Sequence, residues 1–402
     1  MSGPLHGVKV VEVGQFQQGP VAAMRLGDLG ADVIKVEALA GDPGRGFMRL
    51  VAVDAGLTGR NYYFEGHNRN KRSITLDLKK EQGLEVFFKL VEWADVFVNN
   101  LSINAPDRMG IGYDVLRARN PRLIYAHTSG WGRSGPDAEA LSFDYTGIAR
   151  CGTMMIAGER GSPPQSLVPG IGDELGALMC VQAVCAALYA REKTGKGQRV
   201  DTSLMGGLIA MERLALSAPA FLGQEYPRWD RAQAGNAIYN HYKCKDDRWL
   251  ALAHLQPDRY WPNVCQAMGL EELEHDPKFN TIEARHTNAK ELVSILDKKF
   301  ATKARAEWID IFKKESVICA PIQTTMEVVN DPQALANEYI IEVDDPVRGK
   351  TKQVGFPWMF SETPASVRCA APELGEHNEE ILLDLGYSRD DVSRLGQDGV
   401  IL

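Results

Sequence analysis

Short β-branched stretches alternate with helical stretches over the first 130 residues of the chain. The residue pattern predicts strands at 8–13, 32–37, 74–78, 96–98 and 123–127, and helices at 19–29 and 81–93. Strands that are separated by helical crossovers pair in parallel, and both faces of such a sheet are covered. The chain is therefore predicted to be an α/β protein with a parallel sheet.

The length of the chain, 402 residues, exceeds that of one ordinary domain. After residue 225 the composition changes, because aromatic residues crowd together and helices rich in Lys and Glu follow. Several prolines punctuate the stretch beyond residue 320. We predict a large domain at 1–224, a small domain at 225–330, and a return to the large domain at 331–402.

Charge and cysteine usage narrow the class of protein. The formal net charge of −8 weighs against a nucleic-acid partner, since phosphate binding needs concentrated positive charge. The seven cysteines are scattered and never spaced as C-x-x-C, which is typical of reduced thiols in a cytoplasmic protein. The start of the chain does not resemble a secretory signal, and no uninterrupted apolar run predicts a membrane span. The sequence also contains no H-E-x-x-H or paired Cys/His spacing, so we expect no metal site.

The run from Gly170 to Gly176 superficially resembles a dinucleotide fingerprint, but its third glycine comes one place too late. Its acid, Asp173, stands at the start of a predicted buried helix over 174–193. An aspartate there is most often a helix N-cap. The same position also suits a carboxylate nucleophile, with Gly172 and Gly176 leaving room for a thioester and backbone N–H groups for an oxyanion.

Two further features are ambiguous when taken singly. Asp144, in Ser142-Phe143-Asp144-Tyr145, would ordinarily be a turn aspartate. A basic group could form a solvated face or could hold the phosphates of a nucleotide-bearing cofactor; it comprises Lys71, Arg72, Lys79 and Arg108. His127, at the end of a predicted strand, is more often structural than catalytic.

Together these segments resemble the class III CoA-transferase family, which also contains α-methylacyl-CoA racemases. The resemblance runs nearly from end to end, and the order and spacing of the motifs carry it. The matching segments are Gly7-Val8-Lys9-Val10-Val11-Glu12, Leu29-Gly30-Ala31-Asp32-Val33-Ile34-Lys35-Val36-Glu37, Gly41-Asp42-Pro43, Asn70-Lys71-Arg72-Ser73-Ile74-Thr75-Leu76-Asp77-Leu78-Lys79, Asp107-Arg108-Met109-Gly110, Gly172-Asp173, Thr194-Gly195-Lys196-Gly197-Gln198 and Leu374-Gly375-Glu376-His377.

The resemblance implies a Rossmann-like large domain made from both chain ends, a smaller α+β domain, and an interlocked homodimer. It implies that coenzyme A or acyl-CoA is a substrate, with no permanently bound cofactor, and that a free carboxylic acid is the other. The implied catalytic residues are Asp173, Gln17 and Asp144. The implied CoA-binding residues are Leu76, Lys79, Asn100, Arg108, Met109, Lys71 and Arg72. The chain departs from formyl-CoA transferases at Ala38 and Leu141, where an arginine and a lysine would grip CoA.

Phe143 favours a transferase over a racemase. A racemase needs a second base opposite the aspartate, and in that branch a histidine stands at this position, whereas phenylalanine cannot carry a proton. The motifs around Phe143 and Asp173 resemble the branch that acts on 2-hydroxy and aryl acids. A racemase or epimerase, and a catalytically silent CoA-binding subunit of a hetero-oligomer, remain as alternatives.

Overall fold

The computed structural model describes residues 3–47, 61–345 and 349–402, and these fold as two compact units. The first unit comprises residues 1–154, 166–225 and 337–402, and the second comprises 155–165 and 226–336. The change of unit after residue 225 lies next to the sequence-predicted boundary. The return to the first unit comes at residue 337 instead of 331, and the short segment 155–165 joins the second unit, which the sequence analysis did not anticipate.

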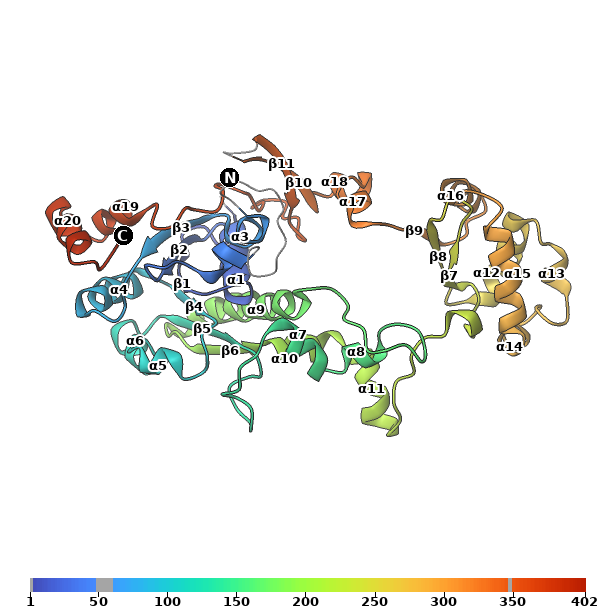
Figure 1. Ribbon diagram of the computed structural model, residues 1–402, viewed down its shortest axis with the longest axis horizontal. Helices are drawn as coiled ribbons and strands as arrows, with labels where there is room; N and C mark the ends of the chain where they lie inside the picture. Colours follow the sequence, from blue (N-terminus) through green and yellow to red (C-terminus); the bar gives the residue numbers. More distant parts are fainter. Residues whose placement is uncertain (1–2, 48–60, 346–348) are drawn as a thin grey trace. The chain divides into compact units, whose positions relative to one another are not determined.

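A six-stranded, wholly parallel sheet forms the centre of the first unit, in the order β3-β2-β1-β4-β5-β6 (Figure 1). Helical crossovers separate its strands, so both faces of the sheet are covered. The strands are β1 (Lys9–Val13), β2 (Asp32–Glu37), β3 (Lys71–Thr75), β4 (Val96–Asn99), β5 (Ile124–Ser129) and β6 (Arg199–Ser203).

Alternate residues of each strand enter separate apolar cores. On β1, Val11 packs with helices α4 (Glu81–Trp93) and α6 (Tyr113–Arg119) and with the C-terminal helices α19 (Asn378–Asp384) and α20 (Arg389–Gln397). Its neighbour Val10 packs on the other face with α1 (Gln18–Asp28) and α9 (Ile171–Thr194). Both chain ends therefore build one domain, as the resemblance implied.

Helix α9 is long and apolar enough to pass a test for a membrane span by length and composition alone. In the structure it lies against α1, β5, β6 and α10, and its residues from Ala177 to Leu188 line the core. The apolar character of α9 is thus explained by its place beneath the sheet. The paired helices α10 (Leu204–Met211) and α11 (Arg213–Leu222) meet the same test only if joined, and they bend by 78° at their junction.

The remaining elements of the first unit are short. They are the 3₁₀ turn η1 (Pro43–Gly46), α3 (Tyr62–Asn68), α5 (Ala105–Arg108), α7 (Asp144–Arg150), α8 (Thr153–Ile156, which runs into the second unit), and the antiparallel pair β10 (Ile340–Asp345) and β11 (Gly349–Val354).

The second unit contains an antiparallel sheet in the order β7-β8-β9 with a helical layer and an aromatic core. Its elements are η2 (Arg231–Gln233), β7 (Tyr239–Lys243), β8 (Trp249–Ala253), α12 (Pro257–Met268), α13 (Glu272–His275), α14 (Ile282–Thr287), α15 (Ala289–Phe300), α16 (Arg305–Lys314), β9 (Cys319–Ile322), α17 (Thr325–Val328) and α18 (Pro332–Ala336). The predicted fold class, a Rossmann-like sheet with a smaller mixed domain, is confirmed.

Candidate active site

The strand order of the first unit reverses between β1 and β4, and ligands of open α/β sheets bind beyond the carboxyl ends of the strands at such a point. Two cavities lie there. Gln15, which follows β1, and Leu101, which follows β4, line both of them. The two cavities are therefore neighbours, and one extended ligand could reach from one into the other.

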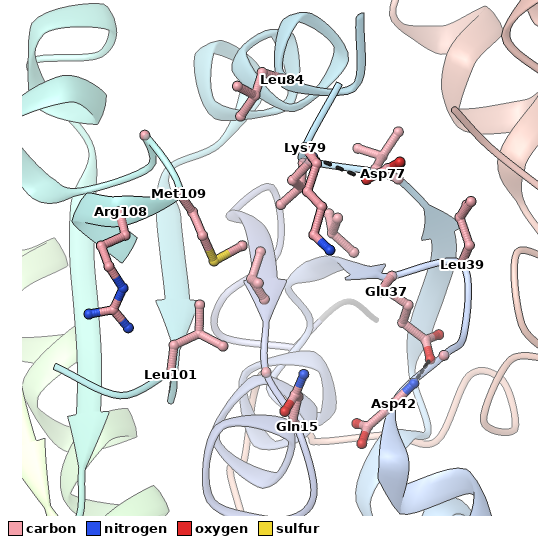
Figure 2. Close-up of a pocket in the computed structure, with 18 residues that line it drawn as sticks. Gln15, Glu37, Leu39, Asp42, Asp77, Lys79, Leu84, Leu101, Arg108 and Met109 are labelled. Carbon is pink, nitrogen blue, oxygen red and sulfur yellow. Dashed lines mark hydrogen bonds between the residues drawn. The ribbon is translucent and has the colours of Figure 1, made fainter. Parts of the chain in front are cut away.

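The larger cavity, of about 890 Å³, contains four of the sequence-predicted CoA-binding residues in its lining: Leu76, Lys79, Arg108 and Met109. The last three are labelled in Figure 2. Lys79 and Arg108 come from opposite sides of the cavity in Figure 2. Both side chains are exposed, and within the described part of the chain neither forms an ion pair. Two uncommitted cations in a mostly apolar lining, which also contains the acids Glu37, Asp42 and Asp77, suit a ligand that has both an aromatic ring and phosphates.

The smaller cavity, of about 350 Å³, brings together the three residues that were predicted to be catalytic, Asp173, Gln17 and Asp144. Phe143, Leu141 and Asn100 also line it. These residues come from the β1–α1 loop, the position after β4, the segment that leads into α7 and the start of α9, so only folding makes them neighbours.

The sequence suggested that Asp173 is the N-cap of its helix, but the structure places another residue there. Helix α9 begins at Ile171, and its N-cap is Gly170, whose φ of 78° lies in the left-handed region that glycine tolerates. Asp173 is thus the third residue of the helix, and Asp144 caps the helix instead. The Asp144 carboxylate accepts hydrogen bonds from the N–H groups of Gly170 (2.8 Å), Gly172 (2.7 Å) and Asp173 (3.3 Å).

This capping corrects the predicted oxyanion site. The N–H groups of Gly172 and Asp173 already donate to Asp144, and the N–H of Glu174 donates to the carbonyl of Gly170. Gly172 and Gly176 are also closely packed against other side chains and do not leave room for a thioester. A Cβ at Gly172 would lie 2.9 Å from the Asp144 carboxylate, and one at Gly176 would lie 2.0 Å from the side-chain amide of Gln18.

The ionisation of Asp173 is governed by burial and by neighbouring charges. A helix N-terminus ordinarily favours the ionised form of a carboxyl group, but burial, together with the negative charges of Asp144 and Glu174, raises the pKa of Asp173 to about 7. A carboxyl group with a pKa near neutrality exchanges its proton readily, which is typical of a functional site.

Gln17 and Asn100 hold positions beside Asp173 through their amides. The Gln17 Nε2 atom makes long contacts of 3.4 Å with the carbonyl of Gly170 and the carboxylate of Glu174. Asn100 accepts from the N–H of Gln15 and donates to its carbonyl, both at 2.8 Å. The Asn100 amide is therefore committed to the β1–α1 loop and is not free to bind CoA.

The contacts of Lys71 and Arg72 do not support the prediction that these two residues bind CoA. The Lys71 ammonium group is fully buried, 2.7 Å from the Glu12 carboxylate. Arg72 forms ion pairs with Asp32, Glu380 and Asp384. Neither residue lines the two cavities, because alternation along β3 turns Lys71 into the domain and Arg72 toward α19.

His127 is also structural in its contacts, since its Nε2 lies 2.9 Å from the Leu101 carbonyl and its ring is buried. Sequence reasoning missed Gln15 and Leu101, although each comes two residues after a strand that borders the switch point. It also missed the aromatic cluster beside Asp173, in which the rings of Phe16 and Phe143 meet edge to face at 6.1 Å.

A parallel doubly wound sheet with an acid-bearing cavity at its switch point is typical of an α/β enzyme that binds its substrate there. The model of CoA-transferase family III matches residues 5–378, and the chain belongs to that family. It is a family III CoA-transferase.

Named relatives agree with this assignment. The chain is 31% identical to (R)-2-hydroxy-4-methylpentanoate CoA-transferase of Clostridioides difficile over 401 residues, 99% of each chain. It is 34% identical to formyl-CoA:oxalate CoA-transferase of Streptomyces avermitilis over 418 residues, which covers all of both chains. Among solved structures, a CaiB/BaiF family protein from Brucella suis superposes with a TM-score of 0.86 at 31% identity, covering 96% of this chain and all of the other.

Proposed function

We propose that this CoA-transferase moves CoA from an acyl-CoA donor to a carboxylic acid through a thioester on Asp173. The observation that carries the proposal is that Asp173 lines a cavity which shares Gln15 and Leu101 with the larger cavity containing Lys79 and Arg108. CoA lying along the larger cavity would bring its thioester to the carboxylate.

In the proposed mechanism, ionised Asp173 attacks the thioester carbonyl of the donor. The C–S bond breaks, which gives a mixed anhydride and a CoA thiolate. The thiolate then attacks the aspartyl carbonyl, so that the donor acid leaves as a carboxylate and aspartyl-CoA remains. The acceptor carboxylate attacks this thioester, and the released thiolate finally attacks the acyl carbon of the new anhydride. Asp173 is thereby regenerated as a carboxylate.

Gln17 is the donor that we assign to the developing oxyanion. Its 3.4 Å contacts are long for hydrogen bonds, so little hydrogen-bond energy is lost when its amide turns toward a substrate. Asp144 keeps the helix terminus in place and supplies a negative charge beside Asp173.

For the acceptor, we propose a monocarboxylic acid with an apolar group, a 2-hydroxy or aryl acid. Among the described residues that line the smaller cavity there is no Lys, Arg or His, whereas Asp144 and Glu139 contribute acids. A second carboxylate on the acceptor would therefore have no cation to pair with. Phe16 and Phe143 instead offer aromatic surface, and Phe47 extends it at 6.5 Å from Phe16.

The covalent step is tested by incubating the protein with 4-methylpentanoyl-CoA and then with hydroxylamine or borohydride. Peptide mass spectrometry should find Asp173 modified and its neighbour Glu174 unmodified, which makes Glu174 an internal control. Asp173→Ala should abolish both labelling and transfer. Unchanged transfer in that variant would refute the mechanism.

The acceptor class is tested by comparing (R)-2-hydroxy-4-methylpentanoate and phenyllactate with oxalate in the same assay. We expect kcat/KM for a hydroxy acid to exceed that for oxalate at least about tenfold, because the second carboxylate is left unpaired. A preference for oxalate would overturn the acceptor assignment and leave the aspartyl mechanism intact.

We also propose that the functional unit is a homodimer with interlocked subunits, as the resemblance implies. Helix α11 supports this, since none of its residues is buried and Leu214, Phe221 and Leu222 expose most of their apolar surface. Analytical ultracentrifugation at micromolar concentration should give a dimer mass, and a monomer that is active on its own would refute the proposal.

A further inference from the structure

The β1–α1 loop, residues 14–17, carries Gln15 between the two cavities and Gln17 beside Asp173. Between these two glutamines lies Phe16, with a φ of 60°. This left-handed conformation is unfavourable for a residue with a Cβ and persists only when its surroundings impose it. Without that turn at Phe16, Gln17 would not face the start of α9.

Two side chains hold this turn: the Asn100 amide bonds both backbone groups of Gln15, and the Asp42 carboxylate bonds the backbone of Phe16. The Asp42 Oδ1 atom accepts a hydrogen bond from the N–H of Phe16 at 3.0 Å and another from the N–H of Gly44 at 2.7 Å. Its Oδ2 atom pairs with the ammonium group of Lys35 at 2.9 Å. Lys35 in turn donates to the carbonyl of Gly14 at 3.0 Å, so Lys35 and Asp42 bind the loop backbone on either side of Gln15.

The network extends across the sheet below the loop. Glu12 pairs with Lys35 at 2.9 Å and with Lys71 at 2.7 Å, and Lys71 donates to the carbonyl of Pro20 at 2.8 Å. The side chains of these residues and of Asp42 are at most 1% exposed. Although burial alone lowers the pKa of Lys35, the carboxylates of Glu12, Asp42 and Glu37 raise it above its ordinary value.

Such a buried chain of alternating charges is a poor source of stability, because each charge is removed from water. It is better suited to fixing one conformation of the backbone that it contacts. Here the contacts at Gly14, Phe16 and Pro20 lie on both sides of Gln17.

We propose that the buried chain Lys71–Glu12–Lys35–Asp42 positions the β1–α1 loop, and that Asp42 acts on catalysis through Gln17. This inference rests on the proposed role of Gln17 in acyl transfer. Asp42 is therefore a positioning residue: it holds the turn at Phe16 that aims Gln17 at the reacting carbonyl.

The test is a double-mutant cycle with Asp42→Ala, Gln17→Ala and the double variant, assayed with 4-methylpentanoyl-CoA as donor and (R)-2-hydroxy-4-methylpentanoate as acceptor. We expect Asp42→Ala alone to lower kcat by about tenfold to a hundredfold, and to lower it less than about twofold when Gln17 is already alanine. Asp42→Asn keeps an oxygen acceptor for the Phe16 N–H and should restore part of the rate. Equal effects of Asp42→Ala in both backgrounds would overturn the proposal.

Asp28→Asn is the matched control, since it removes another buried carboxylate, which pairs with Arg69 at 2.8 Å away from the loop. Asp28→Asn should lower the stability of the protein. The effect of Gln17→Ala on kcat should be the same in the Asp28→Asn background as in the wild type. If Asp42→Ala does not fold, the same cycle is run with Asp42→Asn.

Hydrogen exchange gives a readout that is independent of activity. The amides of residues 14–17 should exchange faster in the Asp42 variant and not in Asp28→Asn, and unchanged exchange would also overturn the proposal. If Gln17→Ala keeps full activity while Asp173→Ala is inactive, this inference fails and the aspartyl mechanism stands.

Discussion

Asp144 caps the helix on which Asp173 stands, and its Oδ1 atom lies 3.3 Å from the backbone nitrogen of Asp173. One carboxylate thus occupies the helix N-terminus that would otherwise stabilise the charge of the other. The result is a carboxyl group whose ionisation is suppressed by burial and by its neighbours' charge.

The first prediction concerns the pH profile. In the proposed mechanism only ionised Asp173 attacks, and its pKa is raised to about 7, so kcat/KM should fall below neutral pH with an apparent pKa near that value. Asp144→Asn removes a nearby negative charge, which favours ionisation of Asp173. The acid limb should therefore move down by about one pH unit or more. Rate measurements from pH 5 to 9 check both profiles, and an acid limb that stays in place in the variant would contradict the assignment.

The second prediction concerns stability. A carboxyl group whose pKa is higher in the folded state binds its proton more tightly there, so folding is favoured at low pH and this contribution is lost as pH rises toward 7. Asp173→Asn cannot ionise, so it should be more stable than the wild type at pH 8 by about 2 kcal/mol, a value discounted because the carboxyl group is only partly buried. The difference should vanish near pH 4.

Urea unfolding at the two pH values measures this difference. Glu174→Gln is the matched control, because the Glu174 carboxylate pairs with Arg25 at 2.7 Å and its loss should not stabilise the protein. A gain in stability for Asp173→Asn that is the same at both pH values would show that ionisation is not its cause.

The sequence predicted the sheet well because strand and helix periodicities are local. The strand 32–37 and the helix 81–93 have the predicted bounds, whereas the strand expected at 74–78 lies at Lys71–Thr75. The site was predicted only in part. The family resemblance named Asp173, Asp144 and Gln17, which line one cavity, but hydrogen bonds between segments far apart in the chain reassigned the cap from Asp173 to Asp144. Hydrogen bonds of this kind leave no periodic pattern in the sequence.

The positions of the basic residues also could not be predicted from the sequence alone. Lys71, Arg72 and Lys79 are close in sequence, yet the alternation of β3 buries the first against Glu12 and pairs the second with acids of α19, while the third reaches the larger cavity. Charge alone could not predict these different environments, because those of Lys71 and Arg72 depend on the face of β3 that each occupies, whereas Lys79 lies in the turn after the strand.

The third prediction separates these residues by kinetics. Lys79→Ala and Arg108→Ala should each raise KM for acyl-CoA about fivefold to fiftyfold with a smaller change in kcat, since both cations face the larger cavity without an ion-pair partner in the described part of the chain. Arg72→Ala, the matched control, should leave KM unchanged because Arg72 is committed to Asp32, Glu380 and Asp384. If Arg72→Ala raised KM as much as Lys79→Ala does, Arg72 would have to be counted among the CoA-binding residues after all.

The fourth prediction is a gain of affinity at Ala38, which lines the larger cavity and is exposed. The position has room for a longer side chain, and among the described residues that line this cavity Lys79 and Arg108 are the only cations that could pair with the phosphates of the proposed CoA. Ala38→Arg should therefore lower KM for acyl-CoA about twofold to tenfold at low ionic strength, and the gain should shrink at high salt because the charges are near solvent. Ala38→Gln, which has similar reach without charge, is the control. If the glutamine variant gives the same gain, packing and not phosphate binding is responsible, and the larger cavity holds CoA by its apolar parts.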